Sequence, residues 1–310
     1  MHAFGNSVAR FRVCTARTPI RRIGAGCALL SILTVACGKM NSGNPAAPSG
    51  PPAQGSTIVY TAIGASDATG HGASVECVPF VDCPNGTGYV PVTARQLRSQ
   101  GFTVNLRNLG IPTAVIGRDF ETLGQQYNRT IAGNFIEQEM PFVLQNSTVV
   151  TIFAGGNEVN TITAALGAGA GGADQTGFID AQVRAFGSDY TTLMNGIRGR
   201  AAAVRIIVLN LPNLGALPYL AHASASQRQA AQRASVGMTT TVINPLTAQN
   251  ATVIDLMCDS RAYQSGNYSS DGFHPNDAGY AFIAGEVVRA ITSTSYPAPR
   301  GSCSQMSLVP

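Results

Sequence analysis

The feature that most constrains the fold is an alternation of short β-branched runs with longer stretches of helical composition. The runs are Thr57–Gly64, Thr103–Leu106, Thr148–Ala154, Val204–Leu209 and Thr252–Met257. Each is brief and almost wholly apolar, which is typical of strands buried on both faces. The helical stretches are Tyr89–Gln100, Ile179–Arg200, Ser224–Ala248 and Asp277–Ala290. This order predicts an α/β fold in three α/β/α layers, with a central parallel sheet of about five strands.

The turn after the first run is a candidate site for a nucleophile. Functional residues of open parallel sheets gather beyond the carboxyl ends of the strands. There the chain reads Gly64–Gly70, with Ser66 delivered toward the start of a helix. Such a turn exposes a hydroxyl, and helix N-terminal amides stabilise nearby negative charge. The alternative is that Ser66 merely caps the helix, and on this segment alone the two interpretations are equal.

Two later segments also carry polar groups at strand ends. After the third run come Gly155 and Gly156, followed by Asn157, whose amide can donate to a developing oxyanion; an Asx-type turn is the alternative. Near the end, Asp271 lies three residues before His274, close enough to bond its Nδ1 and orient the ring. The alternative there is a surface turn. The other three of the four histidines lack such a setting.

Together these segments resemble the SGNH (GDSL-type) hydrolase family, over most of residues 57–291. In that family the nucleophilic Ser follows the first strand, a Gly-x-Asn turn follows the third, and an Asp-x-x-His pair lies near the C-terminus. Ser66, Asn157, Asp271 and His274 match this order. The resemblance implies a flavodoxin-like α/β/α fold and a serine ester hydrolase that forms an acyl-enzyme on Ser66, with no metal or organic cofactor.

The second family block is a short Asn…Gly segment whose backbone N–H completes the oxyanion hole. Here it runs from Asn108, and the family's Gly position falls on Thr113, while Gly110 comes earlier. The resemblance therefore implies an oxyanion hole formed by the Ser66 amide, the Asn157 side chain and the amide of either Gly110 or Thr113. Two further departures are Ala65 and Glu158, which stand where the family usually has Asp.

The substrate is expected to be a small-molecule or glycan ester. Residues 164–177 are rich in Gly and Ala, and we predict a mobile loop that borders the pocket. Its small side chains favour an open site and short-chain acyl or acetyl esters. Two alternatives keep the fold: an envelope acyltransferase, and a non-catalytic envelope carbohydrate-binding protein. A flavodoxin-like nucleotide binder is disfavoured because no phosphate-cradling glycine loop of the usual form is present. We expect a monomer.

The formal net charge of +4 does not indicate a nucleic-acid partner. Five arginines and no acidic residue precede Cys37, and the rest of the chain has a net charge of −1. That remainder has no basic stretch with interleaved aromatic residues. The excess of positive charge belongs to the N-terminal segment alone.

That segment has the organisation of a secretory signal. Arg21 and Arg22 precede an uncharged, mostly apolar run that ends at Ala36. Leu33–Cys37 resembles a bacterial lipobox, although Thr34 stands where such sequences prefer Leu. Lipidation of Cys37 would place the protein in the cell envelope, with this anchor as its only membrane contact. Ordinary cleavage and secretion is the alternative.

We therefore expect three parts: a signal peptide at 1–36, a flexible Pro/Gly/Ser-rich linker at 37–56, and a hydrolase domain at 57–310. The domain contains Cys77, Cys83, Cys258 and Cys303. An even number of cysteines in an exported domain predicts two disulfides, with three possible connectivities. We favour Cys77–Cys83 with Cys258–Cys303, because the first two cysteines can close a local loop. A cysteine-only metal site is the alternative, but no CxxC spacing is present.

Overall fold

The computed structural model describes residues 50–310, so the expected signal segment and Cys37 lie outside the described residues. Five strands form one parallel sheet in the order β2-β1-β3-β4-β5. They are β1 (Thr57–Gly64), β2 (Thr103–Asn108), β3 (Val149–Phe153), β4 (Arg205–Leu209) and β5 (Thr252–Ile254). The predicted parallel α/β architecture is confirmed. The strand order reverses next to β1, which places a crevice at its carboxyl end.

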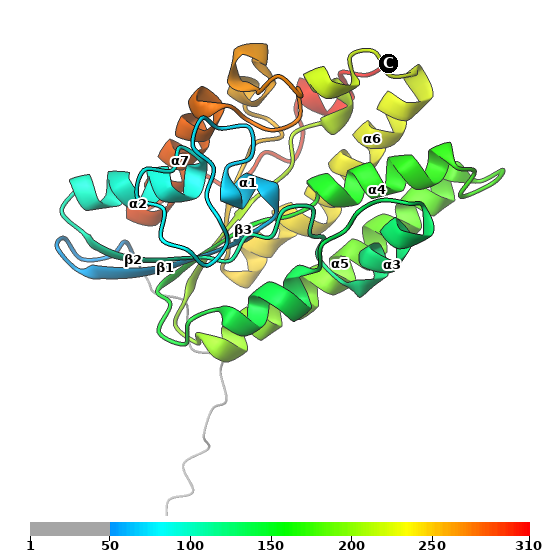
Figure 1. Cartoon of the computed structure of the whole chain (residues 1–310). Helices are drawn as coiled ribbons and strands as arrows, with labels where there is room; N and C mark the ends of the chain where they lie inside the picture. Colours follow the sequence, from blue (N-terminus) through cyan, green and yellow to red (C-terminus); the bar gives the residue numbers. More distant parts are fainter. Residues whose placement is uncertain (1–49) are drawn as a thin grey trace, which may run out of the picture. The chain divides into compact units, whose positions relative to one another are not determined.

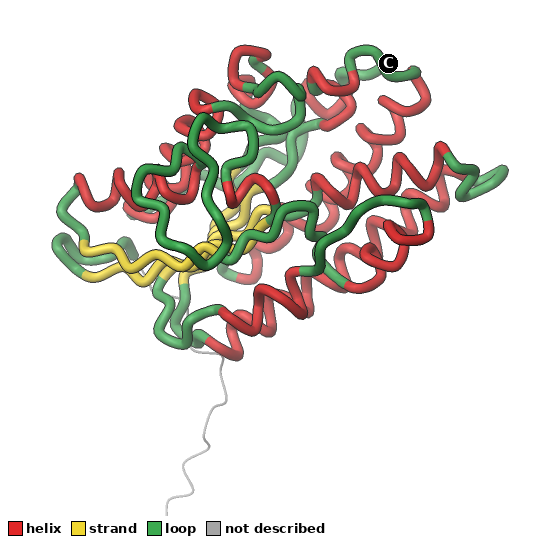
Figure 2. Tube along the Cα trace, in the orientation of Figure 1, coloured by secondary structure: helices red, strands yellow, loops and turns green. Residues whose placement is uncertain are grey.

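Helices cover both faces of the sheet (Figure 1). One face is covered by α2 (Tyr89–Ser99) and α7 (Asp277–Thr292). The other is covered by α3 (Arg118–Gln126), α4 (Gly156–Gly167), α5 (Gln175–Arg200) and α6 (Ala225–Gly237). A further short helix, α1 (Ser66–Thr69), follows β1 directly. In Figure 2 the strands form the central layer between these two groups of helices.

Short 3-10 and π-helical turns occupy many of the connections. The π-helical segments are Phe135–Glu139 and Met238–Ile243. The 3-10 segments are Met140–Phe142, Leu214–Ala216, Pro218–Leu220, Asn244–Gln249, Ser260–Tyr263, Ser265–Asn267 and Ser304–Ser307. Among the described residues, no helix is long and apolar enough to cross a membrane.

The apolar pattern of the strands follows from the two cores. In β4, Ile206 and Val208 pack into the core beneath α4, α5 and α6, while Ile207 and Leu209 pack beneath α2 and α7. Successive side chains of a strand point to opposite faces, so a strand covered on both sides needs apolar residues at every position. This is why β1, β3 and β4 could be recognised as mostly apolar runs, whereas the edge strand β2 includes the exposed Asn105 and the half-buried Arg107.

The prediction of a mobile loop at 164–177 was wrong at both ends. Residues 164–167 are the last turn of α4, where Ala165 and Leu166 are buried, and Gln175 begins α5. Only 168–174 is a connection. Alanine is the best helix former, and α4 contributes a buried face that outweighs the cost of its glycines.

The helix predicted over Ser224–Ala248 was too long. The regular α-helix ends at Gly237. The chain continues as a π-helical segment to Ile243 and then as a 3-10 helix to Gln249. The break falls where three consecutive threonines follow Met238 and Pro245 removes an amide donor. β-branched residues lose rotamer freedom in a helix, and proline cannot continue its hydrogen bonds.

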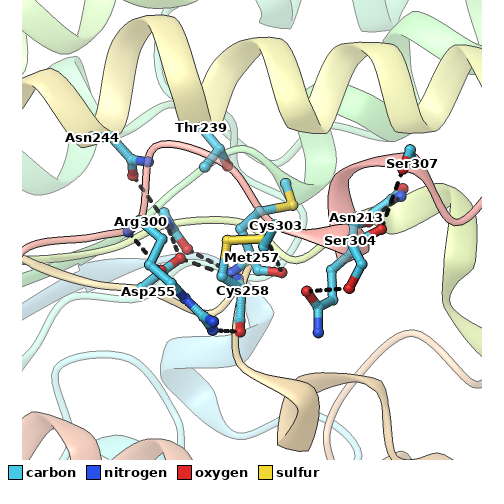
Figure 3. Close-up of a disulfide and its surroundings, with 12 residues drawn as sticks. Asn213, Thr239, Asn244, Asp255, Met257, Cys258, Arg300, Cys303, Ser304 and Ser307 are labelled. Carbon is cyan, nitrogen blue, oxygen red and sulfur yellow. Dashed lines mark hydrogen bonds and ion pairs between the residues drawn. A yellow bond between two sulfur atoms is a disulfide. The ribbon is translucent and has the colours of Figure 1, made fainter.

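Two disulfides are present, Cys77–Cys83 and Cys258–Cys303, which is the connectivity favoured from the sequence. The second bond fixes the C-terminal segment to the loop that follows β5 (Figure 3). Beside it, the Asp255 carboxylate accepts a hydrogen bond of 3.0 Å from the Arg300 amide. Disulfides persist in oxidising surroundings, so this pair agrees with export from the cytoplasm.

Candidate active site

Ser66 lies at the sharp turn between β1 and α1. It is the first residue of α1, and its hydroxyl forms no capping hydrogen bond to the helix backbone. Instead, Oγ lies 2.8 Å from Nε2 of His274. Gly64 permits this turn, because a Cβ there would meet the Cβ of Ala68 at 3.0 Å. The capping interpretation of Ser66 is therefore not the arrangement found.

His274 lies on the loop before α7, between Ser66 and Asp271. Its Nδ1 is 2.6 Å from Oδ2 of Asp271. The other carboxylate oxygen, Oδ1, accepts hydrogen bonds from Ser269 Oγ and from the amides of Phe273 and His274, at 2.8, 2.8 and 2.9 Å. Partial burial raises the pKa of Asp271, but these hydrogen bonds outweigh burial and lower the pKa well below its usual value. The ionised carboxylate keeps the proton on Nδ1 and leaves Nε2 as the acceptor for Ser66.

The loop that carries His274 is held by its neighbours. Phe273 packs edge-on between the rings of Tyr219 and His274, at centroid distances of 4.9 and 4.8 Å. Gly272 has φ +70°, and a Cβ there would lie 2.6 Å from the Tyr219 amide nitrogen. Asn276 caps α7 by accepting from two of its first amides. The imidazole is thus fixed in position by packing as well as by Asp271.

Asn157 is the second residue of α4, beyond the end of β3. Its side-chain Nδ2 donates to the Ala114 carbonyl at 2.9 Å, which uses one of its two N–H groups. The next residue, Glu158, is buried and accepts a hydrogen bond of 2.5 Å from the Ile116 amide. Burial raises the pKa of Glu158 to about 7. Both side chains therefore join the start of α4 to the loop that follows β2.

The two candidate backbone donors on that loop differ in their surroundings. The Gly110 amide donates to Oδ1 of Asn108 at 3.2 Å, and a Cβ on Gly110 would lie 2.5 Å from the Cβ of Ala68. Gly110 is thus needed for close packing against α1. Thr113 has φ +65°, the left-handed conformation that favours glycine, and its amide donates to no other described residue. Of the two amides, that of Thr113 is the one left free.

A buried carboxyl group that the sequence did not indicate supports this region. Glu139 is fully buried, and its Oε2 accepts a hydrogen bond of 2.9 Å from the Gly64 amide, two residues before Ser66. Burial raises the pKa of Glu139 well above its usual value. Nothing local in the sequence marks Glu139, because its partner lies 75 residues away.

A second histidine, which was also not predicted as a site residue, lies beside the catalytic candidate. The rings of His71 and His274 are 4.5 Å apart between centroids, at an angle of 78°. His71 Nδ1 lies 2.9 Å from the Glu76 carboxylate. The signal available in the sequence was the position of His71, five residues after Ser66 and between two glycines. In the structure both glycines have positive φ. Those glycines turn the chain back over the site.

A cavity lies beside Ala65 and Asp67, the two neighbours of Ser66, and about 770 Å³ of space there, open solvent included, is not filled by protein atoms. Its walls include Ala65, Asp67, Gly156 and Asn157, together with a largely apolar set of side chains from the loops after β4 and β5. Burial raises the pKa of Asp67. No residue of 164–177 lines this cavity, so the expectation that this segment borders it was wrong. Asn157 is the second residue of α4, and this 12-residue helix is about 18 Å long, so its far end and the connection after it lie well away from the sheet edge.

Comparison with known proteins points to the same family that the sequence resembles. The model of the GDSL-like Lipase/Acylhydrolase family matches residues 62–282, a range that contains all four residues of the resemblance. No curated protein sequence matches the chain. Among solved structures, the lipase Lip_vut3 from a goat rumen metagenome is similar with a TM-score of 0.53 and 18% sequence identity. The match covers 77% of this chain and 100% of that one, and it shows the shared fold.

Two further solved structures are similar at lower TM-scores. An extracellular lipase from Streptomyces rimosus has a TM-score of 0.46 and 17% identity, with 72% of this chain and 95% of that one covered. The acetylxylan esterase Axe2 from Geobacillus stearothermophilus has a TM-score of 0.47 and 15% identity, with 77% and 97% covered.

Proposed function

We propose that this chain, which belongs to the GDSL-like lipase/acylhydrolase family, is a serine ester hydrolase that acts through an acyl-enzyme on Ser66. One observation carries the proposal. Ser66, His274 and Asp271 form a continuous hydrogen-bonded series, with links of 2.8 and 2.6 Å. A hydroxyl, an imidazole and an ionised carboxylate in this order are the parts that nucleophilic acyl transfer requires.

In the first half-reaction, His274 Nε2 takes the proton from Ser66 Oγ as that oxygen attacks the ester carbonyl carbon. The C=O π electrons move to the carbonyl oxygen, and Asp271 stabilises the imidazolium that forms. Collapse of the tetrahedral intermediate breaks the bond to the alcohol oxygen, and His274 gives its proton to the departing alcohol. Ser66 is left as an acyl ester.

In the second half-reaction, water replaces the alcohol. His274 removes a proton from the water as the water oxygen attacks the acyl carbon and forms a second tetrahedral intermediate. Collapse of this intermediate breaks the bond between the acyl carbon and Ser66 Oγ, and His274 gives its proton to Oγ. The products are a carboxylic acid and the free serine. Apart from the two reactants, the ester and water, the proposed steps use only side chains and backbone amides of this chain.

The oxyanion that forms in both steps needs hydrogen-bond donors. We assign these to the amide of Ser66, the amide of Thr113 and the remaining N–H of the Asn157 side chain. Thr113 is preferred to Gly110 because the Gly110 amide already donates to Asn108. Donors that are already oriented toward the oxyanion stabilise its charge without having to reorganise during the reaction.

The acyl group would enter the cavity beside Ala65 and Asn157. A short acyl or acetyl group fits there whatever the depth of the cavity, so short-chain esters are our first choice of substrate. A small-molecule or glycan alcohol would then leave on the solvent side of His274. Outside the described residues, we propose a signal peptide at 1–36 and a lipid anchor at Cys37, in keeping with the two disulfides of the domain.

A fluorophosphonate probe tests the acyl-enzyme, because it forms a stable bond only with an activated serine. Mass spectrometry of the labelled protein should place the probe on the peptide that contains Ser66. His274→Ala should prevent labelling, since the serine is then without its base. A label on another serine, or equal labelling of the His274→Ala variant, would reject Ser66 as the nucleophile.

A further inference from the structure

The mechanism leaves His71 and Glu76 without a role, although His71 packs against the catalytic histidine and Glu76 pairs with His71. His71 Nδ1 lies 2.9 Å from Oε1 of Glu76, and its ring meets the His274 ring edge-on. When Nδ1–H donates to a carboxylate, the other ring nitrogen, Nε2, carries the free lone pair. A carboxylate that orients a histidine in this way is the usual outer partner of a metal-binding histidine.

The segment that carries His71 is held in place by several independent contacts. The backbone amide of His71 donates to the Ser66 carbonyl at 2.9 Å, and the backbone carbonyl of His71 accepts from Tyr280 Oη at 2.7 Å. Gly72 has φ +87°, and a Cβ there would lie 3.0 Å from the Cβ of His274. A glycine is thus required for the close approach of this segment to the catalytic loop.

Three potential metal ligands meet at this point. One nitrogen of His71, one nitrogen of His274 and one carboxylate oxygen of Asp271 all lie within 4.8 Å of one another. Zinc binds such atoms at about 2.0–2.2 Å, which places two ligands of a tetrahedral site roughly 3.4 Å apart. The ligand atoms therefore have to approach one another by at most about 1.4 Å, and the His71 side chain, which is 50% exposed, has room to move.

We propose that His71, His274 and Asp271 bind a divalent transition-metal cation, with Zn²⁺ as the probe, and that this cation inhibits the enzyme. Two imidazoles and a carboxylate suit Zn²⁺ and do not suit Mg²⁺ or Ca²⁺, which prefer sets of oxygen ligands. A cation shared with Asp271 binds His274 at Nδ1, the nitrogen 2.6 Å from that carboxylate, and displaces the proton that Nδ1 carried. The proton of the neutral ring then lies on Nε2, which can no longer accept one from Ser66, so Ser66 loses its base. Inhibition rests on the proposed function, whereas binding of the cation does not.

Binding is measured first, by titrating Zn²⁺ into the Ser66→Ala protein and following heat by calorimetry. This variant keeps all three ligands and needs no activity. We expect one Zn²⁺ per chain, no binding of Mg²⁺, and loss of Zn²⁺ binding when His71→Ala is added. Adding Glu76→Gln instead should weaken binding by about tenfold or more, because the outer partner is lost.

His222→Ala is the matched control, because His222 is exposed and has no carboxylate partner among the described residues. It should leave Zn²⁺ binding unchanged. Thermal unfolding of each variant shows whether the fold is retained, and Glu76→Gln supplies a second test should His71→Ala unfold. The proposal is overturned if the Ser66→Ala protein binds no Zn²⁺, or if folded His71→Ala or Glu76→Gln variants bind Zn²⁺ as tightly as the His222→Ala control.

The second measurement is inhibition of ester hydrolysis in the protein with Ser66 intact. Micromolar Zn²⁺ should abolish hydrolysis reversibly, with recovery after a chelator is added. The concentration for half inhibition should rise about tenfold or more in Glu76→Gln and stay constant in His222→Ala. Equal inhibition of these two variants would overturn the inhibitory role. Zn²⁺ binding without any hydrolysis of esters would instead reject the proposed function and leave the metal site in place.

Discussion

Single residues differed in how far their positions at the candidate site could be predicted from the sequence. Asp271 and His274 were predictable because a contact between residues three apart depends only on the local turn. Ser66 and Asn157 were singled out by the order of the segments, which resembles a known family, because each segment taken alone left a structural alternative open. Glu139 was not predictable, since nothing near it in the sequence specifies its contact with Gly64.

At this scale the account predicts the effect of Asn157→Ala. Loss of one oxyanion donor should lower kcat by about 10²–10³-fold, with a smaller change in KM, because the donor acts mainly in the transition state. Steady-state hydrolysis of p-nitrophenyl acetate measures both constants. Asn160→Ala removes an amide one turn further along α4 and is the control. Wild-type kcat in Asn157→Ala would remove Asn157 from the oxyanion hole.

Whole elements were predicted well where burial was uniform and poorly where it was not. The inner strands were recognised because both faces of the sheet are covered there, which favours apolar residues at most positions, while the edge strand β2 is less uniformly buried. Helix α4 was missed because its Gly/Ala-rich end resembles a loop in composition, and its stability comes from the packing of Ile162, Ala165 and Leu166. Tertiary packing of this kind is absent from local composition.

The two disulfides should contribute unequally to stability. Cys258–Cys303 closes a loop with a sequence separation of 45, and Cys77–Cys83 one of 6. Loop-closure entropy predicts that the double change to alanine costs about 4 kcal/mol for the first pair and about 2 kcal/mol for the second. Urea unfolding of the two double variants measures the difference. A greater loss from the 77–83 pair would contradict the entropic explanation.

At the scale of the whole molecule, the site forms because the strands β1, β2 and β3 end at one edge of the sheet. The long loop after β5 brings His274 to the same edge. The order of motifs along the chain predicted this assembly, since parallel strands bring their carboxyl ends together. The approach of the 71–76 segment to His274 could not be predicted in the same way. It depends on where α7 and the catalytic loop lie after folding, as the contact of Tyr280 with His71 shows.

The pH dependence of stability tests the buried carboxyl group of Glu158, which joins the start of α4 to the loop that follows β2. Burial raises the pKa of Glu158 from 4.5 to about 7. Between these values the folded protein holds a proton that the unfolded chain has released, so the free energy of unfolding falls as pH rises. The contribution is complete below pH 4.5 and lost above pH 7, and it amounts to about 3 kcal/mol.

Urea unfolding at several pH values between 5 and 8 measures this effect, with Glu158→Gln as the comparison. The variant should lose less stability than the parent across this range, because an amide does not titrate. Asp189, whose pKa is raised to about 6, is present in both proteins and cancels from the difference. Parallel pH profiles for the two proteins would show that Glu158 is not the group responsible.

The most direct test of the central claim is hydrolysis of p-nitrophenyl esters, from acetate to longer acyl chains, by the parent, Ser66→Ala and His274→Ala. His222→Ala serves as the control. The account predicts that the parent and the control hydrolyse at least the acetate ester, and that each active-site change lowers kcat by about 10⁴-fold or more. A folded parent that hydrolyses no ester, or a Ser66→Ala variant that retains the parent's activity, would contradict it.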